Sequence, residues 1–433
     1  MLGIGMRGPL GSDGALPPAQ VVADAGMRMD AAAERDAWTV LATADGLGPI
    51  AFAALLARYG SGRAILAEGA AAGGVQRLMA TPVLEHGASR ERMPVPLAVA
   101  LAIAAASETG ARVLARVREL GLQVLTFDEP SYPGRLAAIE MPPHVLFVLG
   151  DPAALSRPRA VAVVGTRRPT TAGRTLAGRI ATSLTAAGAT VVSGLAFGID
   201  GAAHEATIRA GGTTVAVIGG GHARLSPTAH ARLAEAIVRS GGAIVSEYAP
   251  DVEPTFGTFP RRNRIISGLA EATVVVEAPA KSGALITASW ALDQGRECFL
   301  VPGAIDATAS AGCLAFLREF AGAARMVAGV PQLIADLGLA ATDPSGGLVP
   351  VASAAVTDLG PTAIRLAEAL VGGHATVDEL TAVLDLPVAT VLAGLTLLER
   401  RGLAAGLHGR YRPAGALLGR RDRSARADRA DLA

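Results

Sequence analysis

The feature that most constrains the fold is a series of six short apolar runs, rich in β-branched residues, in the middle of the chain. They read VAVVG (161–165), TVVSG (190–194), TTVAVIGG (213–220), AIVSEY (243–248), TVVVEAP (273–279) and CFLVPG (298–303). Helical patterns separate them at 172–187, 200–210, 228–240, 260–270 and 282–295. Continuous apolar strands that alternate with helices are typical of a parallel sheet covered on both faces. We therefore predict an α/β domain built on a doubly wound parallel sheet.

The remaining residues divide into segments of different character on either side of this domain. The predicted order is a disordered extension (1–30), an N-terminal helical domain (31–120), the sheet domain (121–338), a linker (339–360), a winged-helix domain (361–414) and a charged disordered tail (415–433). Within the winged helix, Thr376 and Glu379 have the spacing of a capping box. The following helix carries Val388, Val391, Leu392, Leu395 and Leu398 on one face, and a wing is centred on His408-Gly409.

A Gly-x-Gly turn, Asp45-Gly46-Leu47-Gly48-Pro49, lies between two helical segments of the N-terminal domain. In helix-hairpin-helix modules such a turn offers backbone N–H groups to a phosphate. The same glycines also suit a plain chain reversal, so the sequence leaves both interpretations open. The domain is predicted to be helical, of a SAM-like or helix-hairpin-helix-like type.

Hydropathy raises the question of a membrane protein, because 51% of the residues are apolar and the mean hydropathy is +0.40. No stretch approaches the roughly 20 uninterrupted apolar residues of a spanning helix. The two cysteines, Cys298 and Cys313, are too few for a disulfide framework or a cysteine-based zinc site. We expect a cytoplasmic protein that has no membrane partner.

Several enzyme classes are excluded by their missing motifs. The single lysine, Lys281, follows Ala280, so there is no Gly-Lys-[Ser/Thr] P-loop. The chain has no G-x-S-x-G nucleophile elbow and no H-E-x-x-H zinc motif. The first strand-to-helix turn reads Gly165-Thr166-Arg167-Arg168-Pro169, which is not the dinucleotide fingerprint. The sequence thus predicts no catalytic residue, no metal ligand and no cofactor.

Small, hydroxyl and basic residues follow the predicted strands, where open α/β domains bind their ligands. The candidate binding residues are Gly165, Thr166, Arg167, Arg168, Ser193, Gly194, Gly220, Arg261, Arg262, Asn263, Arg264, Lys281, Ser282 and Gly283. Helix N-termini at this edge favour phosphate, and guanidinium groups bind it through two hydrogen bonds. Six cations exceed what one nucleotide needs, so we predict a groove for several phosphates. Phe256 and Phe259 are candidates for stacking on unpaired bases.

Four motifs in this region resemble the bacterial DNA-processing protein A family, also called DprA or Smf. They are GTRRPTTAGR, SGLAFGIDGAAH, GTFPRRNRIISGLA and VVVEAPAKSGALITASWALDQGRECFLVPG, in that order over about 160–310. The resemblance implies an extended Rossmann-like domain that binds single-stranded DNA, a homodimer, and no enzymatic activity. It also implies that the protein protects incoming DNA and loads the RecA recombinase onto it during natural transformation.

The chain departs from the family pattern at five positions: Phe197, Ser226, His230, Ala284 and Leu314. Two other functions stay open beside the recombination mediator. One is a nucleotide or nucleoside-phosphate hydrolase, for which Asp200, Glu247 and Glu277 are the candidate acids or bases. The other is a transcription regulator that reads duplex DNA through the C-terminal module, although its second helix, PVATVLAGLTLLERR, is nearly uncharged until its end.

Overall fold

The computed structural model describes residues 18–84, 92–339, 359–372, 374, 376–407, 410–414 and 417. The chain forms two compact units, the first from residues 1–132, 141–147 and 247–250 and the second from the rest. Most of the predicted linker, the wing centre His408-Gly409 and nearly all of the predicted tail lie outside the described residues. The division differs from the boundary expected at residue 120, because strand β3 packs against helix α1 of the first unit.

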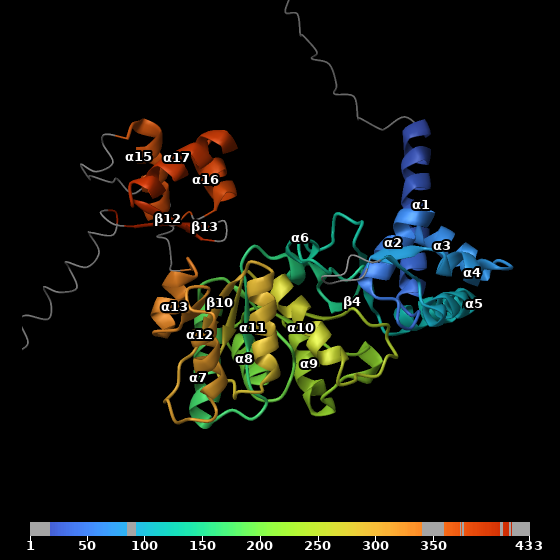
Figure 1. Ribbon diagram of the computed structural model, residues 1–433, viewed down its shortest axis with the longest axis horizontal. Coiled ribbons are helices and arrows are strands. Elements are labelled where there is room, and N and C mark those ends of the chain that lie inside the picture. The colour runs from blue at the N-terminus through green and yellow to red at the C-terminus, as the bar shows by residue number, and fades with distance from the viewer. Residues whose placement is uncertain are drawn as a thin grey trace, which may run out of the picture. The chain divides into compact units, whose positions relative to one another are not determined.

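The first unit is mainly helical (blue to cyan in Figure 1). Its elements are α1 (Pro18–Leu41), α2 (Pro49–Tyr59), α3 (Gly62–Ala70), α4 (Gly74–Met79), β1 (Pro82–Leu84), β2 (Arg92–Pro94), α5 (Leu97–Glu119) and β3 (Gln123–Thr126). The prediction that residues 18–30 belong to a disordered extension is wrong, because they form the start of α1. The many good helix formers in this segment outweigh its single glycine, Gly26.

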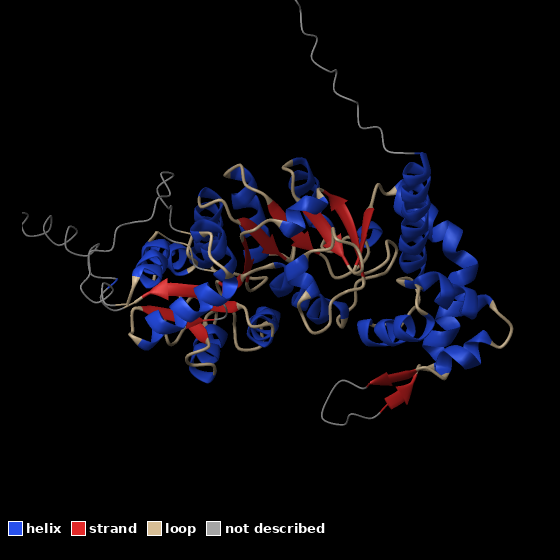
Figure 2. Ribbon diagram, turned by 90° about the horizontal axis from the view of Figure 1, so that it is seen from above, coloured by secondary structure: helices blue, strands red, loops and turns tan. Residues whose placement is uncertain are grey.

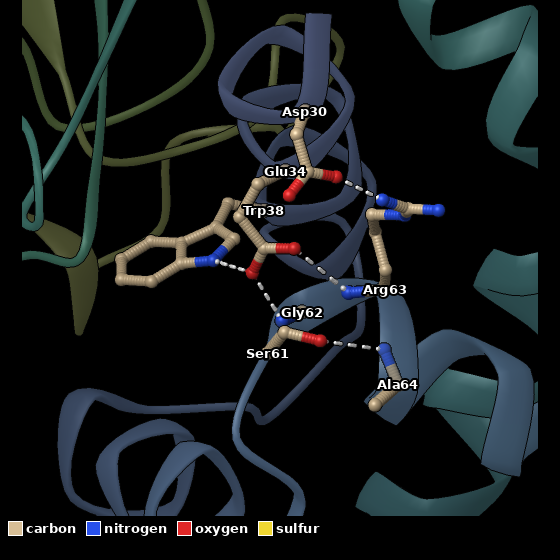
Figure 3. Close-up of polar contacts among 7 residues, drawn as sticks. All are labelled: Asp30, Glu34, Trp38, Ser61, Gly62, Arg63 and Ala64. Atoms are coloured by element: carbon tan, nitrogen blue, oxygen red, sulfur yellow. Dashed lines mark hydrogen bonds and ion pairs between the residues drawn. The ribbon is translucent and has the colours of Figure 1, made fainter. Parts of the chain in front are cut away.

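A carboxylate on α1 fixes the start of α3 (Figure 3). Glu34 accepts hydrogen bonds from Trp38 Nε1 at 2.7 Å, from the backbone N–H of Gly62, and from that of Arg63 at 3.3 Å. Ser61 caps the same helix by accepting from the N–H of Ala64 at 3.1 Å. A side chain at position 62 would lie 2.6 Å from the Trp38 ring, so this contact requires glycine. The N-terminus of α3 is therefore satisfied within the unit.

The Gly-x-Gly turn joins α1 to α2, as expected for a chain reversal. Gly46 has φ 76°, a left-handed conformation that favours glycine. Gly48 precedes Pro49, the first residue of α2, and offers no side-chain cap. Phosphate binding at this turn stays a prediction.

Helix α5 is long and apolar enough to cross a membrane, with a mean hydropathy of 1.5, and two bent helix pairs would also qualify if each were one span. In the first unit, α5 buries Val99, Ala100, Ile103, Ala106 and Val117 and packs against α1 and α3. The helix thus buries part of its apolar surface within this unit, whereas Leu97 and Leu101 on the same helix are exposed.

A nine-stranded sheet has the order β11-β10-β9-β5-β6-β7-β8-β4-β3, and the neighbours from β11 to β8 are parallel. The strands after β3 are β4 (Val145–Gly150), β5 (Ala160–Val164), β6 (Thr190–Ser193), β7 (Thr214–Val217), β8 (Ala243–Ser246), β9 (Ala272–Val275), β10 (Glu297–Leu300) and β11 (Ala324–Met326). Strands β5 to β10 are buried throughout, as their continuous apolar sequences require.

Helices lie on both faces of the sheet in the second unit (Figure 2). They are α6 (Gly134–Ala137), α7 (Thr171–Ala186), α8 (Ile199–Arg209), α9 (Ala231–Arg239), α10 (Thr258–Leu269), α11 (Gly283–Asp293), α12 (Ala311–Glu319) and α13 (Val330–Asp336). Short 3₁₀ turns are η1 (Pro152–Ser156), η2 (His222–Arg224) and η3 (Thr228–His230). The predicted doubly wound α/β fold is confirmed.

The direction of winding reverses between β5 and β9. From β5 the chain moves through α7, α8 and α9 toward β8, and from β9 it moves the other way through α11 and α12 toward β11. Right-handed crossovers then place the two sets of helices on opposite faces. Ala162 of β5 lies opposite Val192 of β6 on one side and Thr273 of β9 on the other. The carboxyl ends of β5 and β9 therefore form a topological switch point, where such sheets bind ligands.

The C-terminal residues form α15 (Pro361–Val371), α16 (Val377–Leu384), α17 (Val388–Arg400), β12 (Ala404–Leu407) and β13 (Arg410–Pro413) around a core of their own. The capping box is confirmed: Glu379 N–H donates to Thr376 Oγ1 at 3.2 Å, and Thr376 N–H donates to the Glu379 carboxylate at 3.1 Å. The predicted apolar face of α17 is only partly buried, because Val388 and Leu392 are exposed. The winged-helix assignment stays a prediction.

Candidate functional site

A cavity of about 640 Å³ opens at the switch point between β5 and β9. The segments that follow these two strands supply much of its wall, and α10 and α11 supply most of the rest. Nine of the predicted residues line it: Gly165, Thr166, Arg167, Arg168, Arg262, Asn263, Lys281, Ser282 and Gly283. The predicted ligand edge and the cavity thus coincide over these residues.

Two exposed arginines stand on the loop after β5. Thr166 N–H donates to the carbonyl of Glu277 at 2.7 Å, and Thr166 Oγ1 accepts from the N–H of Arg168 at 3.2 Å, so the loop is fixed. The Arg167 guanidinium lies over the Phe259 ring at 5.2 Å from its centroid. This cation–π contact orients Arg167 while its charge remains accessible. The loop therefore presents fixed positive charge at the mouth of the cavity.

Lys281 supplies a further exposed cation from the segment that follows β9. It lies in the turn before α11, and Ser282 caps that helix by accepting from the N–H of Ala284 at 3.3 Å. The partial positive charge of the α11 N-terminus adds to that of the ammonium group. An anion in the cavity would meet both.

Lys281→Ala is expected to lower the affinity for single-stranded DNA about tenfold, or about 1.4 kcal/mol. Lys281→Arg should recover only part of this, because a guanidinium group is wider and differently hydrated than an ammonium group. Titration of both variants against the wild type in one buffer, with thermal melts as folding control, measures the effect. Wild-type affinity in the alanine variant would remove Lys281 from the site.

Arg262 is buried beneath the cavity and acts as a brace. Its Nη1 donates to the carbonyls of Gly194, at 2.8 Å, and Val217. Asp200 accepts from the N–H of Gly194 at 3.1 Å. Burial raises the pKa of Asp200 to about 6, while the charge of Arg262 and backbone N–H groups oppose that rise. Arg262 thus joins the loop after β6 and the last residue of β7 to α10.

The four predicted binding residues on α10, 261–264, do not share one surface. Arg264 is buried, and its Nη1 donates to the carbonyl of Arg261 at 2.9 Å. Asn263 is also buried, and its Nδ2 donates to the carbonyl of Gly283 at 3.2 Å. Arg261 is exposed but does not line the cavity. The physical reason is the helix itself: neighbouring residues point about 100° apart, so one run of arginines faces several surroundings.

Three further candidates do not reach the cavity. Ser193 is buried, and its Oγ donates to the carbonyl of Val163 at 2.6 Å. Gly194 lies under Arg262 and Asp200, where a side chain would come within 2.7 Å of both. The carbonyl of Gly220 accepts from Ser246 Oγ at 2.8 Å, and this glycine packs against Pro254. These residues shape the strand ends instead of lining the cavity wall.

The cavity also includes residues that the sequence did not single out, among them Ile286, Thr287 and Thr308. Thr308 follows β10, so the rule that ligands bind beyond strand ends would have pointed to it. Ile286 lies one turn after Gly283 and is 39% exposed. Ile286 is apolar, so the sequence offers no reason to choose it as a binding residue. An apolar side chain beside cations nevertheless suits contact with a base or a sugar.

The carboxylates proposed for hydrolysis are engaged elsewhere or buried. Glu277 accepts from Thr170 N–H at 2.9 Å and from Thr170 Oγ1 at 2.5 Å. Thr170 in turn caps α7 by accepting from the N–H of Gly173 at 3.0 Å. Among the cavity-lining residues of the described chain, Asp200 is the one carboxylate, against four cations. The site is therefore electropositive.

The fold and the cavity define an open α/β protein with a cationic site at its switch point. The family model described as DNA recombination-mediator protein A matches residues 123–337. The DNA processing protein DprA of Bacillus subtilis is 44% identical over 194 residues, which cover 45% of this chain and 65% of that protein. A putative DNA processing protein DprA of Mycobacterium tuberculosis is 41% identical over 274 residues, 62% of this chain and 68% of that protein.

Among solved structures, the X-ray structure of DNA processing protein A from Streptococcus pneumoniae matches with a TM-score of 0.50 and 30% identity, covering 63% of this chain and 95% of that one. The chain belongs to the DNA recombination-mediator protein A family.

Proposed function

We propose that this chain binds single-stranded DNA at the carboxyl edge of its sheet and serves as a recombination mediator. The observation that carries the proposal is the cavity at the switch point, whose walls hold the exposed cations Arg167, Arg168 and Lys281. Several cations from two different segments around one cavity suit the repeated phosphates of a nucleic acid.

Single strands fit this site better than duplex DNA. Phe259 lines the cavity under Arg167, and Phe256 is 98% exposed at its edge. Aromatic faces stack on unpaired bases of any sequence, whereas the bases of a duplex are already stacked inside the helix. The lining offers no set of amide side chains, beyond Asn263, for reading base edges in a groove. Binding should therefore be independent of sequence.

The cellular role that goes with this binding follows from family membership. The matched family model spans residues 123–337, which include every residue of the cavity, and its description as a recombination mediator supports this role. We propose that the protein protects incoming single strands, loads the RecA recombinase onto them during natural transformation, and works as a homodimer.

The proposal is that the site binds without catalysing a reaction. Two features support it. Glu277 accepts hydrogen bonds from Thr170, the N-cap of α7, and Asp200 is buried beside Arg262. A hydrolase would need an acid or base free to reach the phosphate. Equilibrium binding of a single strand and of its duplex, without nucleotide cofactors, tests the proposed function.

A further inference from the structure

An exposed aromatic ring stands beside the cavity without lining it. Phe197 is 47% exposed, although phenylalanine side chains are usually buried in folded proteins. Its neighbour Ala196 lines the cavity. Its other neighbour, Gly198, packs so closely on the loop after β5 that a side chain there would lie 2.4 Å from the carbonyl of Thr166. The backbone of Phe197 therefore lies next to the loop that carries Arg167 and Arg168.

The backbone around this ring is held in an unusual conformation. Leu195 has φ 55° although it is not glycine, and its side chain is fully buried. Gly198 has φ 82°, and the N–H of Gly194 is fixed by Asp200. A strained backbone that the surrounding structure maintains is a feature of binding sites. Here it projects the side chain of residue 197 outward from a rigid loop.

His230 supports the ring from one side. The two ring centroids are 4.9 Å apart, with the planes at 70°, an edge-to-face pair. His230 Nδ1 donates to the carbonyl of Leu195 at 2.9 Å, and its ring packs against Gly201, where a side chain would come within 2.9 Å. The ring of Phe197 is therefore oriented before any ligand arrives, which reduces the entropy cost of binding.

We propose that Phe197, seated on His230, is a stacking site for an unpaired base of the single strand whose phosphates Arg167 and Arg168 bind. The inference rests on the proposed function and adds a base-binding position that is distinct from Phe259, because Phe197 packs on His230 and does not line the cavity. The neighbouring charges favour a nucleic acid over an acidic or apolar protein segment, because an aromatic face beside two arginines matches a base beside its phosphates.

The test compares two strands of equal length and charge, one of oligo-dT and one fully abasic, by fluorescence anisotropy on the full chain. Stacking contributes about 1–3 kcal/mol per base, so Phe197→Leu should weaken oligo-dT binding about tenfold and change abasic binding less than about twofold. Phe197→Trp should keep the wild-type affinity for oligo-dT. Phe127→Leu is the matched control, because Phe127 is a 38% exposed ring in the first unit.

The outcomes separate the two proposals. Equal weakening on both strands would show that Phe197 acts through the shape of the loop, and unchanged binding on both would show that it faces another partner. Either result overturns the stacking site while single-strand binding stands. Failure of the wild type to bind either strand would overturn the proposed function and the stacking site together.

Discussion

Replacement of Arg167, Arg168 and Lys281 together by alanine is expected to weaken single-strand binding about a thousandfold. Each cation should contribute about tenfold. The contribution of Lys281 should add to that of the loop, whereas Arg167 and Arg168 are neighbours, so about a thousandfold is the value for full additivity. Every cation that no longer neutralises a phosphate should also flatten the dependence of log K on log salt by about 0.7, or about 2 for the three. The three side chains are exposed, so the fold should persist, since surface changes cost within about 0.5 kcal/mol each.

A matched triple variant distinguishes binding at the cavity from attraction by the positive charge of the whole surface. Arg209, Arg232 and Arg239 are exposed on α8 and α9 and do not line the cavity. Their replacement by alanine removes the same formal charge and should change affinity and salt slope little. If both triple variants bind equally weakly, the positive charge acts over the whole surface and the cavity is not the site.

Arg262→Ala should destabilise the protein by about 3–5 kcal/mol, because it leaves the buried Asp200 carboxylate and two carbonyls without their partner. This corresponds to a melting temperature lower by about 10 °C for a domain of this size. Arg261→Ala, one residue away and exposed, is the control and should melt within about 2 °C of the wild type.

A second comparison tests the pairing itself. Asp200→Asn combined with Arg262→Met should cost less than the sum of the two single changes, because neither partner is then left as an unpaired buried charge. Thermal denaturation of the four proteins gives the coupling energy. Additive losses would show that Arg262 and Asp200 act independently, and would contradict the brace described above.

The sheet is predictable from the sequence because its signal is local. Strands buried on both faces need mostly apolar sequence, and β5 to β10 have it, with threonine, serine or Glu297 at a few positions. The loops after β5 and β9 can be assigned to one edge from the parallel arrangement alone. Their meeting at a switch point depends on strand order, which the sequence does not encode in any short motif.

The burial of Arg262 and Arg264 cannot be predicted from the sequence, because arginine is normally exposed. A run of consecutive basic residues on a helix also does not indicate which of them face the interior. The contacts of Arg262 with Gly194 and Val217, residues far away along the chain, distinguish it from Arg261. The start of α1 is obscured for a different reason: glycine and proline are frequent before Pro18, and the helix formers follow them without a sharp change in composition.

The most direct test of the central claim is a salt titration of the wild-type full chain with a single strand and with its duplex, in the absence of nucleotide cofactors. We expect tight binding of the single strand, at least about tenfold tighter than of the duplex, with a slope of log affinity against log salt of about −0.7 per phosphate contact. Equal affinity for duplex, or an affinity independent of salt, would contradict a single-strand site at the carboxyl edge of this sheet.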